Sequence, residues 1–165
     1  MTVLTTERLI LRAAQDGDLA PLFDVFSNPD AMKYWSNAPH ISIDETRPTF
    51  EKLSRPGPRT YFVIEYQGKA VGTAGVHSGD EIGFILHPDH WRKGLMREAV
   101  EAIAHHIWKT TDFARITADA DPDNTASVLF LTALGFRETG RAKNTFCING
   151  VWSDSVYFAL ERPAK

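Results

Sequence analysis

The residues whose types and spacing could do chemistry gather between Glu81 and Ala99, in the stretch EIGFILHPDHWRKGLMREA. A β-rich run ends at a proline turn, and a short basic loop then opens directly into an amphipathic helical pattern. This order places unpaired backbone amides, the positive end of a helix and several cations at one point. Such a point can hold a phosphate-bearing ligand.

The loop itself predicts which groups would contact an anion. Gly94 has no Cβ, so a ligand oxygen could approach its backbone closely. One exposed helix end stabilises an anion by only about 0.3–1 kcal/mol, so several amides would have to act together. A plain strand–turn–helix with solvated basic residues is the alternative, and spacing alone leaves both open. The residues that we expect at the anion are Arg92, Lys93, Gly94, Leu95, Met96 and Arg97.

Length and composition indicate one ordinary globular domain over residues 1–165. The chain has 43% hydrophobic and 24% charged residues, a formal net charge of −3 and a single cysteine. This balance argues against a nucleic-acid-binding surface, which is normally basic. No apolar run reaches the roughly 18 residues of a membrane span, and the N-terminus lacks a signal-peptide core. We therefore expect a cytoplasmic protein without nucleic-acid or membrane partners.

Hydrophobic periodicity predicts the elements that must position the loop. Strands are expected at residues 9–11, 61–66, 70–76, 81–86 and 115–120, and as two arms around an Asn-Gly turn within residues 136–160. Helices are expected at residues 19–26, 44–53, 96–107 and 124–134. Together they predict an α+β (mixed α/β) sheet with helices on its faces.

Four segments, in order, resemble a GNAT-superfamily N-acetyltransferase of the branch that includes the ribosomal-protein N-terminal acetyltransferases. They are TERLILR with NPDAMKYW, EIGFILHPDHWRKGLMREA, NTASVLFLTALGF and NGVWSDSVYFAL. The resemblance implies a mostly antiparallel, twisted sheet that splays between its fourth and fifth strands, counted from residue 9. It also implies acetyl-CoA as cosubstrate. We expect no metal, because no carboxylate or cysteine joins the histidines at ligand spacing.

The resemblance further implies where acetyl-CoA would lie. The pantetheine arm would run between the splayed strands, against the backbone of Ile85, Leu86 and His87. The pyrophosphate would sit on residues 92–96. Asn124 and Ser127 would face the thioester end.

Two departures from the family pattern are visible. The loop begins with Trp91, which is familiar in this branch, and ends with Met96 in place of Gly or Ala. Leu131 stands where many members carry a Tyr general acid, so that role must pass elsewhere or be unnecessary.

Acetyl transfer needs a neutral amine, a polarised carbonyl and a proton for the leaving thiolate. An α-amine has a pKa near about 8 and a lysine amine near about 10.4, so a base helps a lysine more. Glu81 is the candidate base, acting through a water, or else an exposed strand-start carboxylate. Ser127 is the candidate donor to the thiolate, or else a capping serine. The Leu86 backbone amide could hold the oxyanion.

The acceptor side is predicted less specifically. Tyr34, Trp35 and Trp152 could line an acceptor groove, although aromatic residues in such loops often cover the core. Asp154 could bind a cationic acceptor or close a strand pair. The acceptor would be a protein N-terminus or a small amine, and the alternative function is a non-catalytic acyl-CoA-binding module. The oligomeric state, monomer or homodimer, stays open.

Overall fold

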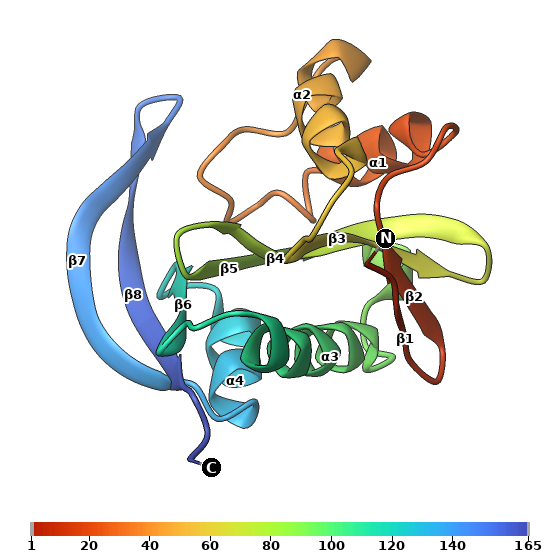
Figure 1. Ribbon diagram of the computed structural model, residues 1–165. Helices are drawn as coiled ribbons and strands as arrows, with labels where there is room; N and C mark the ends of the chain where they lie inside the picture. Colours follow the sequence, from red (N-terminus) through yellow and green to blue (C-terminus); the bar gives the residue numbers. More distant parts are fainter. Residues whose placement is uncertain (1, 165) are drawn as a thin grey trace.

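The computed structural model in Figure 1 describes residues 2–164 and shows a central sheet with helices on both faces. The eight strands are β1 (Leu4–Thr5), β2 (Leu9–Arg12), β3 (Tyr61–Tyr66), β4 (Lys69–Ser78), β5 (Glu81–Leu86), β6 (Arg115–Ala120), β7 (Arg137–Ile148) and β8 (Val151–Glu161). The helices are α1 (Leu19–Phe26), α2 (Ile43–Ser54), the 3-10 turn η1 (Pro88–His90), α3 (Leu95–Thr110) and α4 (Thr125–Ala133).

The strands follow the order β1-β2-β3-β4-β5-β6-β8-β7, and every neighbouring pair is antiparallel except β5 with β6. The predicted mixed fold with a mostly antiparallel sheet is therefore confirmed. Because the short β1 adds a strand before residue 9, the predicted fourth and fifth strands are β5 and β6.

The sheet opens between β5 and β6. One register pair, Glu81 with Thr117, joins these parallel strands. The Thr117 amide donates to the Asp80 carbonyl at 2.8 Å, and its hydroxyl donates to the Asp80 carboxylate at 2.9 Å. From this anchored end the strands separate toward Leu86 and Ala120, so the backbone edges that face the gap are available to a ligand.

Two hydrophobic clusters lie on opposite faces of the sheet, which explains why both helix layers stay attached. The larger cluster joins α3 and α4 to the sheet through fully buried residues such as Phe62, Ile103 and Leu131. The smaller cluster joins α1 and α2 to the other face through Leu22, Phe26 and other apolar side chains. Figure 1 shows α1 and α2 above the sheet and α3 and α4 below it.

The β7–β8 hairpin extends beyond the rest of the sheet. β6 pairs with β8 only from Glu161 back to Val156, whereas β7 and β8 stay paired out to Ile148 and Val151. The turn residues Asn149 and Gly150 both have positive φ, 52° and 81°, as a two-residue hairpin turn requires. Figure 1 shows this hairpin curving away from the body of the molecule.

Candidate functional site

The predicted anion loop joins β5 to α3 and has an unusual backbone. Arg92 has φ +62° and Gly94 has φ +76°, so two residues two positions apart adopt left-handed conformations. Glycine takes this conformation readily, but in arginine it is uncommon and strained. Turns of this kind direct successive N–H groups into one concavity, which is a common way for backbone to bind anions.

The first turn of α3 continues the same surface. Gly94 is its N-cap residue and has no side chain, so no side-chain cap occupies the first amides of the helix. Leu95 is 1% exposed and anchors the helix start in the core, while Arg92, Lys93 and Arg97 are exposed around it. Met96 is half-buried against the larger cluster, so it contributes its backbone to this surface.

The strand edge that faces the gap belongs to alternate residues of β5. The His87 amide donates to Val71 of β4 at 2.9 Å. Because N–H directions alternate along a strand, the amides of Ile85 and His87 face β4, and those of Phe84 and Leu86 face β6. Leu86 therefore presents its amide to the gap, as an oxyanion donor requires. Phe84 was not predicted as a residue that faces the gap. The alternating directions of the β5 amides can be assigned only when one hydrogen bond of the strand is known.

The Leu86 carbonyl is also held in place. It accepts a hydrogen bond from the Trp91 indole at 2.8 Å. Trp91, the first residue of the loop, therefore holds the end of β5 in place. This gives a structural role to the tryptophan at this position of the family pattern.

Asn124 and Ser127 form one hydrogen-bonded unit at the start of α4. The Asn124 carboxamide accepts from the Ser127 amide at 3.2 Å, and its NH₂ group donates to the Ser127 hydroxyl oxygen at 2.9 Å. Asn124 is thus the N-cap of this helix. Since the Ser127 oxygen already accepts a hydrogen bond from the Asn124 NH₂ group, the Ser127 hydroxyl can donate its own hydrogen bond elsewhere.

Glu81 and Asp119 share the sheet face that carries α1 and α2. Burial and then the neighbouring Asp80 raise the pKa of Glu81. Burial also raises the pKa of Asp119, with the charges of Glu81 and Asp121 adding to it and a Ser155 hydrogen bond opposing it. Two carboxyl groups with raised pKa values beside a gap in the sheet are typical of a functional site.

Asp119 was not predicted from the sequence. The pattern of β6 could have found it, because Ile116 and Ala118 are buried against α3 and the residues between them face the other side. Asp119 lies near Glu81 only because β6 runs parallel to β5 and next to it. Local periodicity does not show which strands are neighbours.

The aromatic residues predicted for the acceptor differ from one another. Trp35 packs edge-on against Phe26, with ring centroids 5.6 Å apart, and is half-buried against the smaller core cluster. Tyr34 is half-buried beside Lys33, whose ammonium lies 5.2 Å from its ring centroid. Trp152 lies on the distant β7–β8 hairpin and is 58% exposed.

Asp154 closes the irregular part of the same hairpin. Its carboxylate accepts a hydrogen bond from the Asn144 amide at 2.8 Å, where β7 departs from regular pairing. Trp35 and Asp154 thus have structural partners, whereas Trp152 remains free to contact another molecule.

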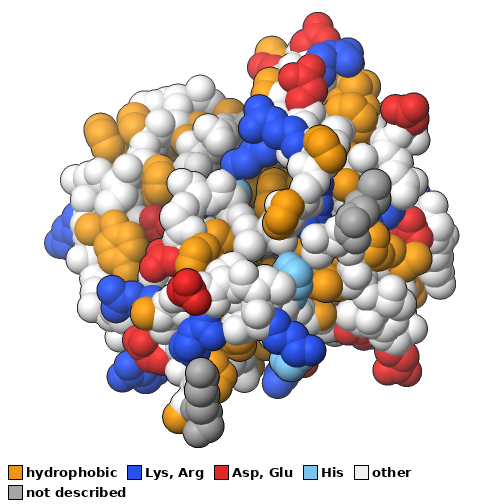
Figure 2. Space-filling model, viewed as in Figure 1, with side chains coloured by type: hydrophobic (Ala, Val, Ile, Leu, Met, Phe, Trp, Pro, Cys, Tyr) orange, Lys and Arg blue, Asp and Glu red, His pale blue; other side chains and the backbone are white. Residues whose placement is uncertain are grey.

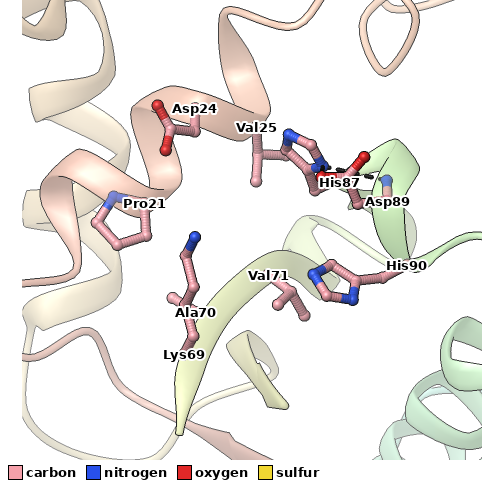
Figure 3. Close-up of a pocket in the computed structure, with 9 residues that line it drawn as sticks. All are labelled: Pro21, Asp24, Val25, Lys69, Ala70, Val71, His87, Asp89 and His90. Carbon is pink, nitrogen blue, oxygen red and sulfur yellow. Dashed lines mark hydrogen bonds and ion pairs between the residues drawn. The ribbon is translucent and has the colours of Figure 1, made fainter. Parts of the chain in front are cut away.

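A separate cavity of about 180 Å³ lies between α1, the start of β4 and η1. Figure 3 shows Asp24 of α1 and Lys69 of β4 across this cavity from His87 and His90. It is smaller than the roughly 300–1,000 Å³ typical of ligand pockets, and we assign no ligand to it. Across residues 2–164, no group of three His, Cys, Asp or Glu side chains is arranged to hold a metal ion.

Charges are mixed over the face drawn in Figure 2, where acidic and basic side chains lie interspersed among hydrophobic ones. No helix within residues 2–164 combines the length and apolar character needed to cross a bilayer.

Comparison with known proteins places this geometry in a family. Residues 8–137 match the acetyltransferase (GNAT) domain. The N-acetyltransferase p20 of Bacillus licheniformis is 29% identical over 97% of this chain and 96% of its own. The [ribosomal protein uS5]-alanine N-acetyltransferase of Escherichia coli K12 is also 29% identical, over 97% of this chain and 91% of its own. The spermidine N(1)-acetyltransferase of Vibrio cholerae is 27% identical over 89% of each chain.

Solved structures agree with these relatives. An acetyltransferase of the GNAT family from Bacillus anthracis has a TM-score of 0.85 at 26% identity, covering 98% of this chain and 99% of its own. Spermidine N-acetyltransferase from Vibrio cholerae, in complex with CoA and spermine, has a TM-score of 0.80 at 25% identity, covering 95% and 97%. The resemblance to the ribosomal-protein branch is confirmed, since its members are among the relatives. The protein belongs to the GNAT acetyltransferase family and is an N-acetyltransferase.

Proposed function

We propose that this protein transfers an acetyl group from acetyl-CoA to a primary amine by direct attack in a ternary complex. The observation that carries the proposal is the separation of β5 from β6 directly beside the left-handed loop of Arg92 and Gly94. The gap offers unpaired backbone to a pantetheine arm, and the loop offers amides and cations to a pyrophosphate. Acetyl-CoA, when bound, supplies an acetyl group activated as a thioester.

The residues of the chain would hold this cosubstrate mainly through backbone. The loop amides of residues 92–96 face the pyrophosphate, with Arg92, Lys93 and Arg97 adding positive charge. The backbone of Phe84 and Leu86 on β5 would face the pantetheine arm, and Asn124 and Ser127 lie at the start of α4.

Each chemical step has a candidate group. Glu81, whose raised pKa makes it a better proton acceptor than an exposed carboxylate, takes a proton from the amine through a water. The Leu86 amide stabilises negative charge on the carbonyl oxygen while the new N–C bond forms. The Ser127 hydroxyl donates a hydrogen bond to the sulfur as the C–S bond breaks. Asn124 supports this donation, because it occupies the acceptor side of the Ser127 oxygen.

The acceptor is an amine that carries positive charge before deprotonation. Two carboxyl groups, Glu81 and Asp119, lie on the face where the acceptor would approach, and they favour a cation. The names of the relatives point to two classes, a protein N-terminal alanine and a polyamine.

The test is an assay of free CoA thiol with acetyl-CoA and a panel of acceptors. The panel contains N-terminal peptides, amino acids, polyamines and aminoglycosides, each with and without protein. We expect thiol release with at least one amine, and the acetylated product identified by mass spectrometry. CoA binding without release for any amine would instead support a non-catalytic acyl-CoA-binding module.

A further inference from the structure

The turn between β1 and β2 is tied to the first turn of α3. The Glu98 carboxylate accepts hydrogen bonds from the Thr6 hydroxyl, from the Arg8 amide at 2.9 Å and from the Arg8 Nε at 2.9 Å. The side chain of Glu98 is only 17% exposed, and that of Arg8 is 39% exposed. Thr6 and Arg8 belong to the segment TERLILR, which carried part of the family resemblance and has no role in the proposed chemistry.

Arg8 also reaches the anion loop. Its Nη1 donates to the Lys93 carbonyl at 2.8 Å, and its Nη2 lies 3.5 Å from where a Cβ on Gly94 would be. One guanidinium therefore bridges Glu98 and the peptide between Lys93 and Gly94. The planar fork of arginine can make both contacts at once, which a lysine ammonium at the same place would not reproduce.

Holding the Lys93 carbonyl fixes the direction of the Gly94 amide. In a planar trans peptide the N–H points opposite to the preceding C=O. Glycine permits both signs of φ, so this peptide could flip and turn the amide inward at little steric cost. With its carbonyl bound by Arg8, the peptide keeps the Gly94 amide pointing away from the β1–β2 turn.

Glu98 would otherwise oppose an anion at this helix end. Partial burial acts to raise the pKa of Glu98, but hydrogen bonds from Thr6 and Arg8 outweigh it and leave the pKa lowered. Glu98 is thus an anion in the first turn of α3, and Arg8 compensates its charge.

We propose that Arg8, held by Glu98 and Thr6, is a positioning residue that orients the Gly94 amide toward the pyrophosphate of CoA. This inference rests on the proposed cosubstrate site and goes beyond it, because Arg8 would act through the Lys93 carbonyl and not as a ligand contact.

The experiment compares two ligands, CoA and pantetheine, on four proteins: wild type, Arg8→Met, Arg8→Lys and the control Arg137→Met. Arg137 is an exposed arginine paired with Glu161 at 3.8 Å, far along the chain from the loop. Calorimetric titration measures the Kd of CoA, and ligand-observed NMR at millimolar concentration measures that of pantetheine. We expect Arg8→Met to raise the Kd of CoA about tenfold, which is about 1.4 kcal/mol. The Arg8→Lys effect is expected to be smaller, and the control unchanged.

Pantetheine separates positioning from general damage, because it lacks the pyrophosphate. Its affinity is expected to be the same in all four proteins. An equal loss for both ligands would overturn the proposal in favour of a structural role for Arg8, as would an unchanged Kd of CoA in Arg8→Met. If wild type does not bind CoA, the proposed function fails together with this inference. If wild type binds and the variants match it, only this inference fails.

The double variant Arg8→Met/Glu98→Gln separates orientation from charge compensation. If Arg8 orients the Gly94 peptide, removing the Glu98 charge leaves CoA binding weak. Full recovery of wild-type affinity would overturn the positioning role, because it would show that Arg8 only neutralises Glu98. If Arg8→Met folds poorly, the same measurements can be made on Arg8→Lys and Glu98→Gln in its place.

Discussion

The cosubstrate side and the acceptor side of this enzyme are built in different ways. The proposed cosubstrate side uses mostly backbone from one continuous stretch, β5 through the first turn of α3, with a second short unit at Asn124 and Ser127. The proposed acceptor side would depend on side chains from distant segments, such as Glu81, Asp119 and the hairpin residue Trp152. Backbone geometry tolerates changes of side chain, whereas a side-chain surface changes with every substitution. The cosubstrate can therefore be inferred from this chain more closely than its acceptor.

The largest effect expected from one substitution is on the acceptor side, at Glu81. Glu81→Gln should lower kcat/KM about 10²- to 10⁴-fold, the usual contribution of a general base. In wild type, the rate should fall as the pH drops through the raised pKa of Glu81, because the protonated carboxyl cannot accept a proton. The variant should lose that limb of the profile. Rates measured between about pH 5 and 9 check this.

The affinity for CoA is the control for Glu81→Gln, and it should not change. A variant with the wild-type rate and pH profile would remove Glu81 from the mechanism. A variant that instead loses CoA binding would place Glu81 on the cosubstrate side and contradict the division into a cosubstrate side and an acceptor side.

The next effect in size is on the cosubstrate side, at Ser127. Ser127→Ala should reduce kcat about 10- to 100-fold, since a hydrogen bond to a charged group is worth about 1.5–3 kcal/mol. Thr125→Ala, at an exposed position of the same helix, is the matched control. If the two variants have equal rates, Ser127 acts only as part of the helix cap.

A smaller effect separates two tryptophans that the sequence placed together. Trp152→Ala should raise the KM for the acceptor a few-fold and change the unfolding free energy by less than about 0.5 kcal/mol, because its side chain is 58% exposed. Trp35→Ala should cost stability, about 0.5–3 kcal/mol, through lost packing of a half-buried ring against Phe26. Denaturant unfolding and steady-state kinetics on both variants measure this. If Trp35→Ala instead raised the KM and Trp152→Ala instead cost stability, Trp35 would be the acceptor residue and Trp152 the structural one.

The smallest effect is the dependence of stability on pH at Asp119. Its pKa in the folded protein is raised, chiefly by burial, so the folded state binds this proton more tightly than the unfolded chain. The resulting stabilisation is complete below the unfolded pKa and is lost as the pH rises through the folded pKa. Asp119→Asn should therefore have a higher melting temperature than wild type at pH 7, with the difference shrinking near pH 4. A lower melting temperature at pH 7 would contradict the burial argument.

The sequence predicted the parts of this enzyme that are local in the chain. Apart from the short β1, the strand and helix positions followed from periodicity. Gly94 marked the loop because it has no Cβ, and its φ of +76° is a conformation that glycine adopts readily. Asn124 and Ser127 followed from the family resemblance, and the structure shows that they also form a local unit three residues apart at the start of α4.

Features that depend on tertiary structure were missed. Arg8 and Lys93 are 85 positions apart, and only the packing of β2 and α3 brings them together. Asp119 joins Glu81 through the parallel pairing of β5 with β6, which neither strand shows alone. Trp35 and Trp152 carry the same aromatic signal, and only burial distinguishes a core residue from an exposed one.

The division between the two sides is tested most directly by titrating CoA, without any acceptor, into wild type, Gly94→Val and Trp152→Ala. Valine strongly disfavours the left-handed backbone at position 94, at a cost of about 1–2 kcal/mol, so the loop amides should shift. We predict that Gly94→Val binds CoA about tenfold more weakly or worse, while Trp152→Ala binds it as wild type does. Wild-type affinity in Gly94→Val, or a loss confined to Trp152→Ala, would contradict a cosubstrate site made from the loop backbone.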